Sequence, residues 1–137
     1  MLKSINLSQL ILEVEPIKNG IFIAKYSKKD EQIARLMMSL DLTDEDRALL
    51  PEEYHNSCYL ENLKVSKDFR RKGLGKNLLD QAKIQAVSLN RGIVLFAGES
   101  VGDDPIPIKD LAKFYRFNAF ERIYCAFIDH IYHWRGK

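Results

Sequence analysis

The residues with the clearest chemical potential form a glycine-containing basic segment at positions 70–76, with the sequence Arg-Arg-Lys-Gly-Leu-Gly-Lys. Glycine lets the backbone adopt positive φ angles and approach a ligand closely. If a helix begins here, its unpaired N–H groups and its dipole favour an anion, and the surrounding cations add to that field. The basic segment therefore predicts a phosphate-binding site. It matches neither common nucleotide motif, because Asn77 replaces the Ser or Thr of a P-loop and Leu78 replaces the third glycine of a dinucleotide-binding fingerprint.

A carboxylate on an apolar strand face is the second candidate. The segment Ser57–Val65 precedes the basic segment and has the composition of a strand. With a period of two, one face carries Tyr59, Glu61, Leu63 and Val65, and the other carries Cys58, Leu60, Asn62 and Lys64. An acidic residue on an otherwise apolar face is unusual, which singles out Glu61.

Histidine and cysteine do not form a favoured metal or nucleophile motif. The spacings His55-x-x-Cys58 and His130-x-x-His133 offer ligand types that zinc accepts. However, Cys58 is predicted on the strand face opposite Glu61, and residues 130 and 133 alternate faces if that tail is a strand. Cys58 and Cys125 lie in apolar predicted strands, so we expect reduced thiols that pack rather than react. No metal site is predicted.

The predicted elements place the basic segment between a strand and a helix. Aliphatic residues in 74–89 fall in one sector of a helix, and the continuous apolar run 93–97 is typical of a buried strand. Strand, helix and strand in this order predict a parallel unit. The other predicted elements are a hairpin of 7–14 and 21–26, helices at 30–40, 43–51 and 108–117, and strands at 121–128 and 131–134.

The whole chain has the size and composition of one globular domain. It has 137 residues, of which 46% are hydrophobic and 29% charged, so bulk disorder is excluded and we treat 1–137 as a single domain. Its longest apolar run, 123–128, is far shorter than the ~20 residues that span a bilayer. No secretory signal is visible, so a cytoplasmic protein without membrane contact is expected. The net charge of +2 hides two opposed blocks, with −5 over residues 41–53 and +5 over residues 64–76.

The sequence from Leu63 to Leu79 resembles the acyl-CoA-binding segment of the GNAT acyltransferase superfamily. That family carries (Arg/Gln)-x-x-Gly-x-(Gly/Ala), here at Arg70, Gly73 and Gly75, after a strand ending in Leu-x-Val and before a helix with paired aliphatic residues. The run Phe-Tyr-Arg-Phe-Asn-Ala-Phe at 114–120 is similar to a second motif of the family. The resemblance implies an α/β fold with a mixed sheet. It would have an N-terminal antiparallel hairpin and two helices, a central parallel strand pair splayed around the cofactor, and a C-terminal helix and strands.

The resemblance also implies acetyl-CoA as the cofactor. Its pyrophosphate would lie on the basic segment and its pantetheine on the strand edge, where a backbone N–H near Leu63 would polarise the acyl carbonyl. Tyr115 matches the general acid of the family. Glu61 is the best candidate for the base, with Tyr59, Glu99 or a water molecule as alternatives. The implied cofactor-binding residues are Leu63, Lys64, Val65, Arg70, Arg71, Lys72, Gly73, Leu74, Gly75 and Lys76.

The implied activity is acetyl transfer to a primary amine by direct attack. The acidic block lies in the region that lines the acceptor cleft of the family, which favours a cationic small molecule or a protein amine as acceptor. Two alternatives remain: a toxin of the GNAT type that acetylates aminoacyl-tRNA, and a non-catalytic CoA-binding regulatory module. Ile108 and Ala119 stand where the family often has Asn and Gly, and this departure is the reason for keeping the CoA-binding module as an alternative. Nucleic-acid binding alone is not favoured, because CoA phosphates would occupy the basic block. A homodimer stays open.

Overall fold

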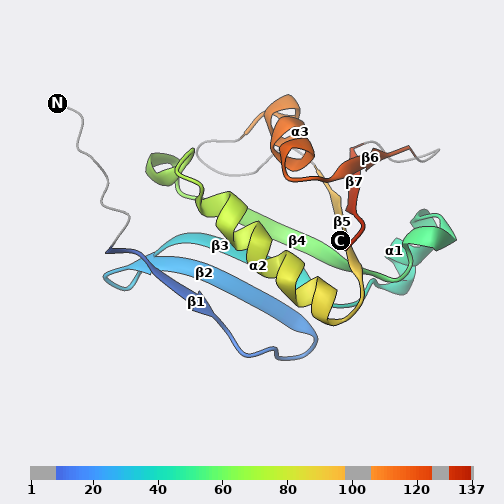
Figure 1. Ribbon diagram of the computed structural model, residues 1–137, viewed down its shortest axis with the longest axis horizontal. Coiled ribbons are helices and arrows are strands. Elements are labelled where there is room, and N and C mark those ends of the chain that lie inside the picture. The colour runs from blue at the N-terminus through green and yellow to red at the C-terminus, as the bar shows by residue number, and fades with distance from the viewer. Residues whose placement is uncertain (1–8, 98–105, 125–129, 137) are drawn as a thin grey trace.

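One seven-stranded mixed sheet forms the centre of the molecule in the computed structural model, which describes residues 9–97, 106–124 and 130–136. Its strands lie in the order β1-β2-β3-β4-β5-β7-β6 (Figure 1). The strands are β1 (Ile11–Val14), β2 (Ile21–Lys28), β3 (Glu31–Ser39), β4 (Ser57–Val65), β5 (Gly92–Phe96), β6 (Glu121–Ile123) and β7 (Ile131–Trp134). The helices are α1 (Asp44–Leu49), α2 (Leu74–Ser88) and α3 (Ile108–Phe117), with 3-10 turns at Glu52–Tyr54 and Lys67–Phe69.

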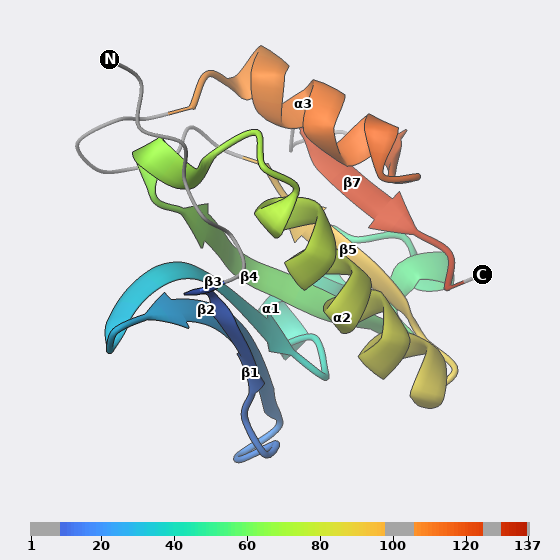
Figure 2. The same cartoon turned by 60° about the vertical axis from the view of Figure 1, so that its left-hand side comes forward.

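Helices cover the two faces of this sheet unequally (Figure 2). α2 and α3 lie on one face and share a large core with it, in which α2 buries Leu74, Leu78, Leu79, Ala82 and Ala86. The sequence predicts this helix face correctly. The opposite face has a smaller core near α1, built from Leu42, Leu50, Val94, Ile123 and Ile131. The central strands therefore have helices α2 and α3 on one side and the acidic helix α1 on the other.

The two central strands are parallel, as predicted, but they separate along their length. β4 pairs with β5 over Ser57 to Tyr59 only, opposite Gly92 to Val94. β4 then continues to Val65 while paired with β3 on its other side. Within the described residues, the second half of β4 has no strand partner on its β5-facing edge. The backbone N–H and C=O groups of such an edge can bond another chain or a ligand.

Residues 30–40 form a strand, and the helix predicted there is wrong. β3 is antiparallel to β2 along its whole length and antiparallel to β4 on its other edge. Ala34, Leu36 and Met38 are buried with a period of two, as expected for a strand. The helical pattern misled because Ile33 and Met37 also fit the i, i+3, i+4 spacing, and periodicity cannot separate these cases over a short apolar run. β3 therefore extends the N-terminal hairpin to three strands.

The second predicted helix is present as α1. The side-chain oxygen of Thr43 accepts a hydrogen bond from the Asp46 N–H at 3.1 Å, as the sequence predicts for an N-cap. Asp44, Glu45 and Asp46 occupy its first turn, where the helix dipole favours negative charge. The sequence predicts two helices in this region, and one of them is present, because the residues of the first form β3.

An extra residue in β4 reverses the faces expected from strict alternation. Met37 pairs with Asn62 and Met38 pairs with Leu60, so Glu61 stands opposite no residue of β3 and forms a β-bulge. Leu60 and Leu63 consequently both pack into the core beneath α2. The predicted grouping of Glu61 with Leu63 and Val65 on one face is therefore wrong.

The C-terminal part completes the sheet as a hairpin. β7 lies between β5 and β6 and is antiparallel to both, which confirms that the last residues pair back. The predicted strand 121–128 is described only over Glu121–Ile123, and residues 125–129 lie outside the described residues, as do residues 7 and 8 of the predicted hairpin. Within the described ranges, no helix is long and apolar enough to cross a membrane.

Candidate active site

The basic segment leads into α2 with a backbone that leaves the helix N-terminus open. Arg71 and Gly73 have φ angles of 61° and 83°, so the chain turns sharply before the helix. Gly73 is the N-cap, and no side chain caps the first N–H groups of α2. Those N–H groups have no partner within the helix and carry the positive end of its dipole. The local geometry therefore leaves an open helix N-terminus beside the basic segment, where the sequence predicts an anion site.

The two glycines of the segment have different roles. A Cβ on Gly73 would meet no atom within 4 Å, so this residue faces open space, and its left-handed φ favours glycine. A Cβ on Gly75 would lie 3.4 Å from Cζ of Phe114 and 3.8 Å from Cγ2 of Val65. Gly75 thus lets the start of α2 pack closely against α3 and the end of β4.

Two cations of the segment already have partners. The Nε–H of Arg70 donates to the carbonyl oxygen of Val65 at 3.0 Å, which fixes the loop against the end of β4. Nζ of Lys76 lies 2.9 Å from a carboxylate oxygen of Asp80, and both side chains are largely exposed. An exposed pair of this kind contributes about 0–1 kcal/mol, so a phosphate could displace Asp80 readily.

A pocket of about 690 Å³ lies between the basic segment, the end of β4 and α3. Of the predicted cofactor residues, its wall includes Leu63, Val65, Arg70, Arg71, Gly73, Gly75 and Lys76. Lys64, Lys72 and Leu74 do not line it. Lys64 is the register partner of Arg35 in β3 and lies on the sheet face opposite α2. Lys72 is exposed, and the Leu74 side chain is buried in the core.

α3 supplies the other wall of this α2–α3 pocket, which sequence reasoning did not predict beyond Tyr115. Most of the additional residues recur every three or four positions, as one face of a helix requires; they are Ile106, Pro107, Asp110, Leu111, Lys113, Phe114, Phe117 and Asn118. The signal was present in the sequence, because the helix 108–117 was predicted and its spacing defines this face. What the sequence lacked was the information that this face turns toward the basic segment.

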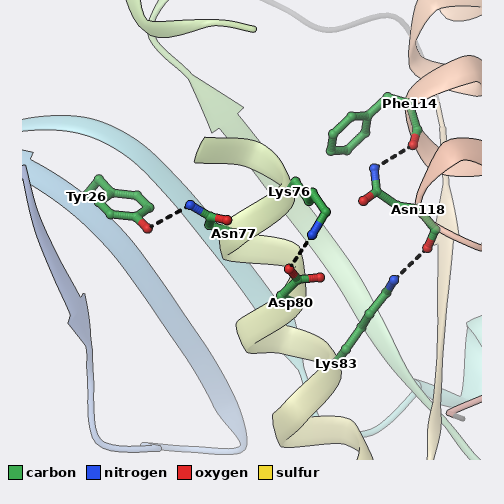
Figure 3. A network of polar contacts seen from close by, with 7 residues as sticks. All are labelled: Tyr26, Lys76, Asn77, Asp80, Lys83, Phe114 and Asn118. Atoms are coloured by element: carbon green, nitrogen blue, oxygen red, sulfur yellow. Dashed lines mark hydrogen bonds and ion pairs between the residues drawn. The ribbon is translucent and has the colours of Figure 1, made fainter. Parts of the chain in front are cut away.

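A short chain of hydrogen bonds holds α3 against α2 beside the pocket (Figure 3). Nζ of Lys83 donates to the carbonyl oxygen of Asn118 at 2.6 Å, and Nδ2 of Asn118 donates to the carbonyl oxygen of Phe114 at 2.8 Å. The Lys83 ammonium also lies over the rings of Phe120 and Trp134, at 5.7 and 5.2 Å from their centroids. Burial lowers the pKa of Lys83. We call Lys83, Asn118 and Phe114 the α2–α3 clamp.

Tyr115 lies in the pocket wall and in the core at once. Its side chain is 7% exposed and contacts the rings of Phe114, Phe120 and Tyr132. Burial raises the pKa of Tyr115 to about 12. The phenol therefore keeps its proton at neutral pH, which suits a proton donor and excludes a phenolate base.

Glu61 and Tyr59 lie at the point where β4 leaves β5. Glu61 is exposed on the bulge, two residues beyond the last residue paired with β5. Tyr59 packs against Phe96 with 5.5 Å between ring centroids. Burial raises the pKa of Tyr59, and the carboxylates of Asp46 and Glu61 raise it further. A carboxylate is thus the better proton acceptor here than the neutral phenol. Glu99, the weaker alternative, lies outside the described residues.

Comparison with known protein families identifies the family of this chain. The model of the acetyltransferase (GNAT) family matches residues 12–104, which contain the basic segment and the separating strand pair. The chain belongs to the GNAT acetyltransferase family. The search of curated protein sequences found no match to the chain.

Solved structures share the GNAT fold at low sequence identity. The anti-CRISPR protein AcrVA5 is 23% identical with a TM-score of 0.55, and the match covers 74% of this chain and 90% of that one. The PaiA N-acetyltransferase from Thermoplasma acidophilum, solved with coenzyme A, is 16% identical with a TM-score of 0.60, covering 84% and 60%. The ribosomal-protein-S18-alanine N-acetyltransferase from Escherichia coli is 13% identical with a TM-score of 0.57, covering 86% and 70%. At these identities the comparison shows the fold.

The histidine and cysteine residues considered as metal ligands or nucleophiles have other partners in this GNAT fold. His55 Nε2 lies 2.9 Å from the carbonyl oxygen of Leu50, and His133 Nε2 lies 3.4 Å from the hydroxyl of Ser57. Cys58 is fully buried, and burial raises the pKa of its thiol to about 11, so it is a poor nucleophile. In the part of the chain that the structure describes, no three His, Cys, Asp or Glu side chains gather as metal ligands would.

Proposed function

We propose that this protein transfers an acetyl group from acetyl-CoA to a primary amine by direct attack. The observation that carries the proposal is the continuity of the α2–α3 pocket. One pocket is lined by residues at the open N-terminus of α2, by Leu63 and Val65 of the unpaired half of β4 and by Tyr115. A phosphate site, an edge for an amide-containing arm and a proton donor are the three things that a thioester of coenzyme A requires.

The residues present fit coenzyme A in chemistry and in size. The N–H groups at the start of α2, with Arg70, Arg71, Lys72 and Lys76, would hold the phosphates. The apolar walls contributed by Leu63, Val65 and Phe114 suit the pantetheine, which would also bond the β4 edge over residues 63–65. Bound acetyl-CoA supplies the activated acetyl group. A volume of about 690 Å³ lies within the range of ligand pockets.

Two side chains would move the protons of the reaction. The exposed carboxylate of Glu61, directly or through a water molecule, would accept a proton from the attacking ammonium. Tyr115 would donate its phenolic proton to the leaving sulfur. A backbone N–H near Leu63 on the unpaired edge of β4 would stabilise the charge on the acyl oxygen.

The acceptor side favours a cationic amine. α1 lies on the face of the sheet opposite α2 and carries three acidic residues in its first turn, and Asp46 and Glu61 both act on Tyr59. Their negative potential would attract an ammonium group and repel a polyanion. This charge also weighs against aminoacyl-tRNA as the acceptor. In a competition assay with equal concentrations of amines, cationic acceptors should be consumed before acidic ones.

The experiment measures thiol release from acetyl-CoA with a panel of amines. Tyr115→Phe should lower kcat at least tenfold with little change in acetyl-CoA affinity, because it removes the proton donor and keeps the ring packing. Glu61→Gln should lower kcat/KM at least tenfold, because it removes the proton acceptor without changing the bulge.

Tyr124→Phe provides the matched control, since Tyr124 is 79% exposed on the far edge of the sheet. It should leave turnover unchanged. Full turnover in Tyr115→Phe would remove Tyr115 as the acid. Tight CoA binding without thiol release from any amine would favour the non-catalytic module.

One observation weakens that module as an alternative. The family position usually held by glycine is Ala119 here, yet Ala119 adopts the left-handed conformation itself, with φ of 71°. The turn after Tyr115 therefore has a left-handed residue at this position, at a cost in strain, which supports a catalytic protein. Asn118, the residue before it, has φ of −97°.

A further inference from the structure

An apolar groove lies on the sheet face opposite α2, away from the α2–α3 pocket. It has a volume of about 580 Å³, and its apolar lining comes from Ile21 and Ile23 of β2, Met37 of β3 and Ile17 of the β1–β2 turn. The turn residues Glu15, Pro16, Lys18 and Asn19 complete the lining. Ile17 is 44% exposed, and the other three are partly exposed. We call it the hairpin groove. Side chains of this kind are buried in most proteins, so a groove lined by four of them indicates a partner.

The groove lies on the same face of the sheet as part of β4. Ile23 is the register partner of Met37, and Met37 is the register partner of Asn62, the residue that follows Glu61. Register partners place their side chains on the same face, so the groove opens on the face that carries Tyr59 and Asn62. Two inter-strand steps of about 4.8 Å separate Ile23 from Asn62, which gives roughly 10 Å.

We propose that the acceptor amine belongs to a polypeptide, and that an apolar side chain about three residues away from that amine docks in the hairpin groove. This inference rests on the proposed acetyltransferase function. An extended chain advances about 3.3 Å per residue, so roughly 10 Å corresponds to three residues. A small polyamine has no apolar group to place in the groove while its amine lies at Glu61.

Charge and chemistry agree with a peptide carrying a lysine or an N-terminal amine. Asp46 and Glu61 would attract the ammonium. At the groove itself, Glu15 lies 3.6 Å from the Lys25 ammonium and Lys18 contributes a positive charge, so the groove has no net charge that would compete for the amine. The reaction forms one N–C bond and breaks the C–S bond of the thioester. The ammonium gives up two protons: one leaves on Glu61 or water, and the other balances the thiol that is released.

The first experiment scans the position of one apolar residue. Ten-residue peptides carry a central lysine, a Gly/Ser/Arg background and one leucine placed one to five residues before or after the lysine. Acetylation is followed as thiol release from acetyl-CoA, with spermidine as a small cationic reference. We expect kcat/KM to be highest with leucine about three residues from the lysine, about tenfold above the peptide with glycine there, which corresponds to about 1.4 kcal/mol.

The second experiment removes the groove. In Ile17→Ser and Ile23→Thr the ratio of kcat/KM for the leucine peptide to that for the glycine peptide should fall from about ten toward one. The matched control is Ile84→Ser, which changes an isoleucine that is 65% exposed on α2 and should keep the ratio of the wild type. Ile17 lies in an exposed turn, so its variant tests the groove even if Ile23→Thr proves unstable by thermal melting.

The outcomes separate this inference from the function beneath it. A preference for leucine that is absent, or that persists in both groove variants, overturns the docking site. Turnover of spermidine without turnover of any peptide overturns the polypeptide acceptor and leaves the acetyltransferase intact. A dimer in sedimentation that dissociates in Ile17→Ser would show that a second copy covers the groove, and would also overturn the proposal. Failure to release thiol with every amine would remove the proposed function itself.

Discussion

The phenol of Tyr115 combines two properties that usually conflict. It lies among aromatic rings in the core, yet it reaches the wall of a ligand pocket. Burial is the cause of its raised pKa, so the phenol, which is neutral at pH 7 even when exposed, keeps its proton further into the alkaline range. A donor of this kind needs no charged neighbour, and its protonation is insensitive to salt.

This burial predicts a loss of stability at high pH. The unfolded tyrosine loses its proton near pH 10, whereas the folded one keeps it until about pH 12. Between these values the unfolded state binds fewer protons, so the free energy of unfolding falls as pH rises, by up to about 2–3 kcal/mol. Urea unfolding of wild type and Tyr115→Phe from pH 9 to 11.5 measures this. The wild type should lose more stability than the variant, and parallel curves would contradict the prediction.

Ala119 predicts a stabilising substitution. A residue with a Cβ in the left-handed region costs about 1–2 kcal/mol, and Ala119 is exposed, so its side chain contributes little packing. Ala119→Gly should therefore raise the free energy of unfolding by about 1 kcal/mol and the Tm by a few degrees. Ala48→Gly in the exposed helix α1 is the control and should lower stability. A lower Tm in Ala119→Gly would show that the strain is absent.

At the scale of elements, α2 and α3 form the pocket together because the clamp ties the C-terminus of α3 to the middle of α2. Lys83 of α2 donates a hydrogen bond to the carbonyl oxygen of Asn118 at the end of α3. It neutralises the negative end of the α3 dipole while its ammonium rests over two rings.

The clamp predicts a coupled loss of stability and cofactor affinity. Lys83→Met removes the hydrogen bond to Asn118 and the cation over the rings, and should lower the free energy of unfolding by about 1–2 kcal/mol. CoA binding, measured by calorimetry, should weaken several-fold because Phe114 and Asn118 shift in the pocket wall. Lys83→Arg should restore part of both. Lys109→Met, an exposed change on α3, is the control, and equal effects of the two methionine variants would rule out the clamp.

The sequence predicts local elements well, but it predicts poorly how distant elements pair and pack. The start of α1 at Thr43, the buried face of α2 and the open helix at Gly73 follow from neighbouring residues, and the structure confirms them. The strand β3 was not predicted. The helical spacing of its residues is outweighed by hydrogen bonds to β2 and β4, and the sequence alone does not reveal these partners. The wall that α3 contributes was missed for the same reason. Its residues share a face by spacing, but only packing decides which way that face turns.

At the scale of the whole molecule, the nearly neutral chain separates its charges across the sheet. The basic segment stands at the N-terminus of α2, and the acidic first turn of α1 lies on the opposite side (Figure 2). Equal totals of opposite sign therefore do not cancel in space. A ligand on either side experiences mainly the nearer block, since the Debye length is about 8 Å at physiological ionic strength.

This separation predicts how CoA binding responds to salt. Raising NaCl from 50 to 500 mM should weaken the Kd of CoA by about tenfold, because several phosphate charges are neutralised by the basic segment. The double variant Arg71→Gln, Lys72→Gln should bind more weakly and show a smaller dependence on salt. The matched change in the acidic block, Asp44→Asn with Glu45→Gln, should leave both quantities unchanged. A CoA affinity that is independent of salt would contradict this assignment of the phosphates.

Glu61 contributes in two separable ways. Its carboxylate is a candidate proton acceptor, and its backbone is the extra residue that makes the β-bulge in β4. Substitution removes only the first. Deleting Glu61 would place Leu60 directly before Asn62, opposite Met38 and Met37, and regular alternation would then keep Leu63 and Val65 in the core beneath α2. A substitution therefore tests the carboxylate alone, whereas a deletion removes the carboxylate and the bulge together without inverting the strand. Comparing Glu61→Gln with the deletion would show how much of the contribution of position 61 belongs to the bulge.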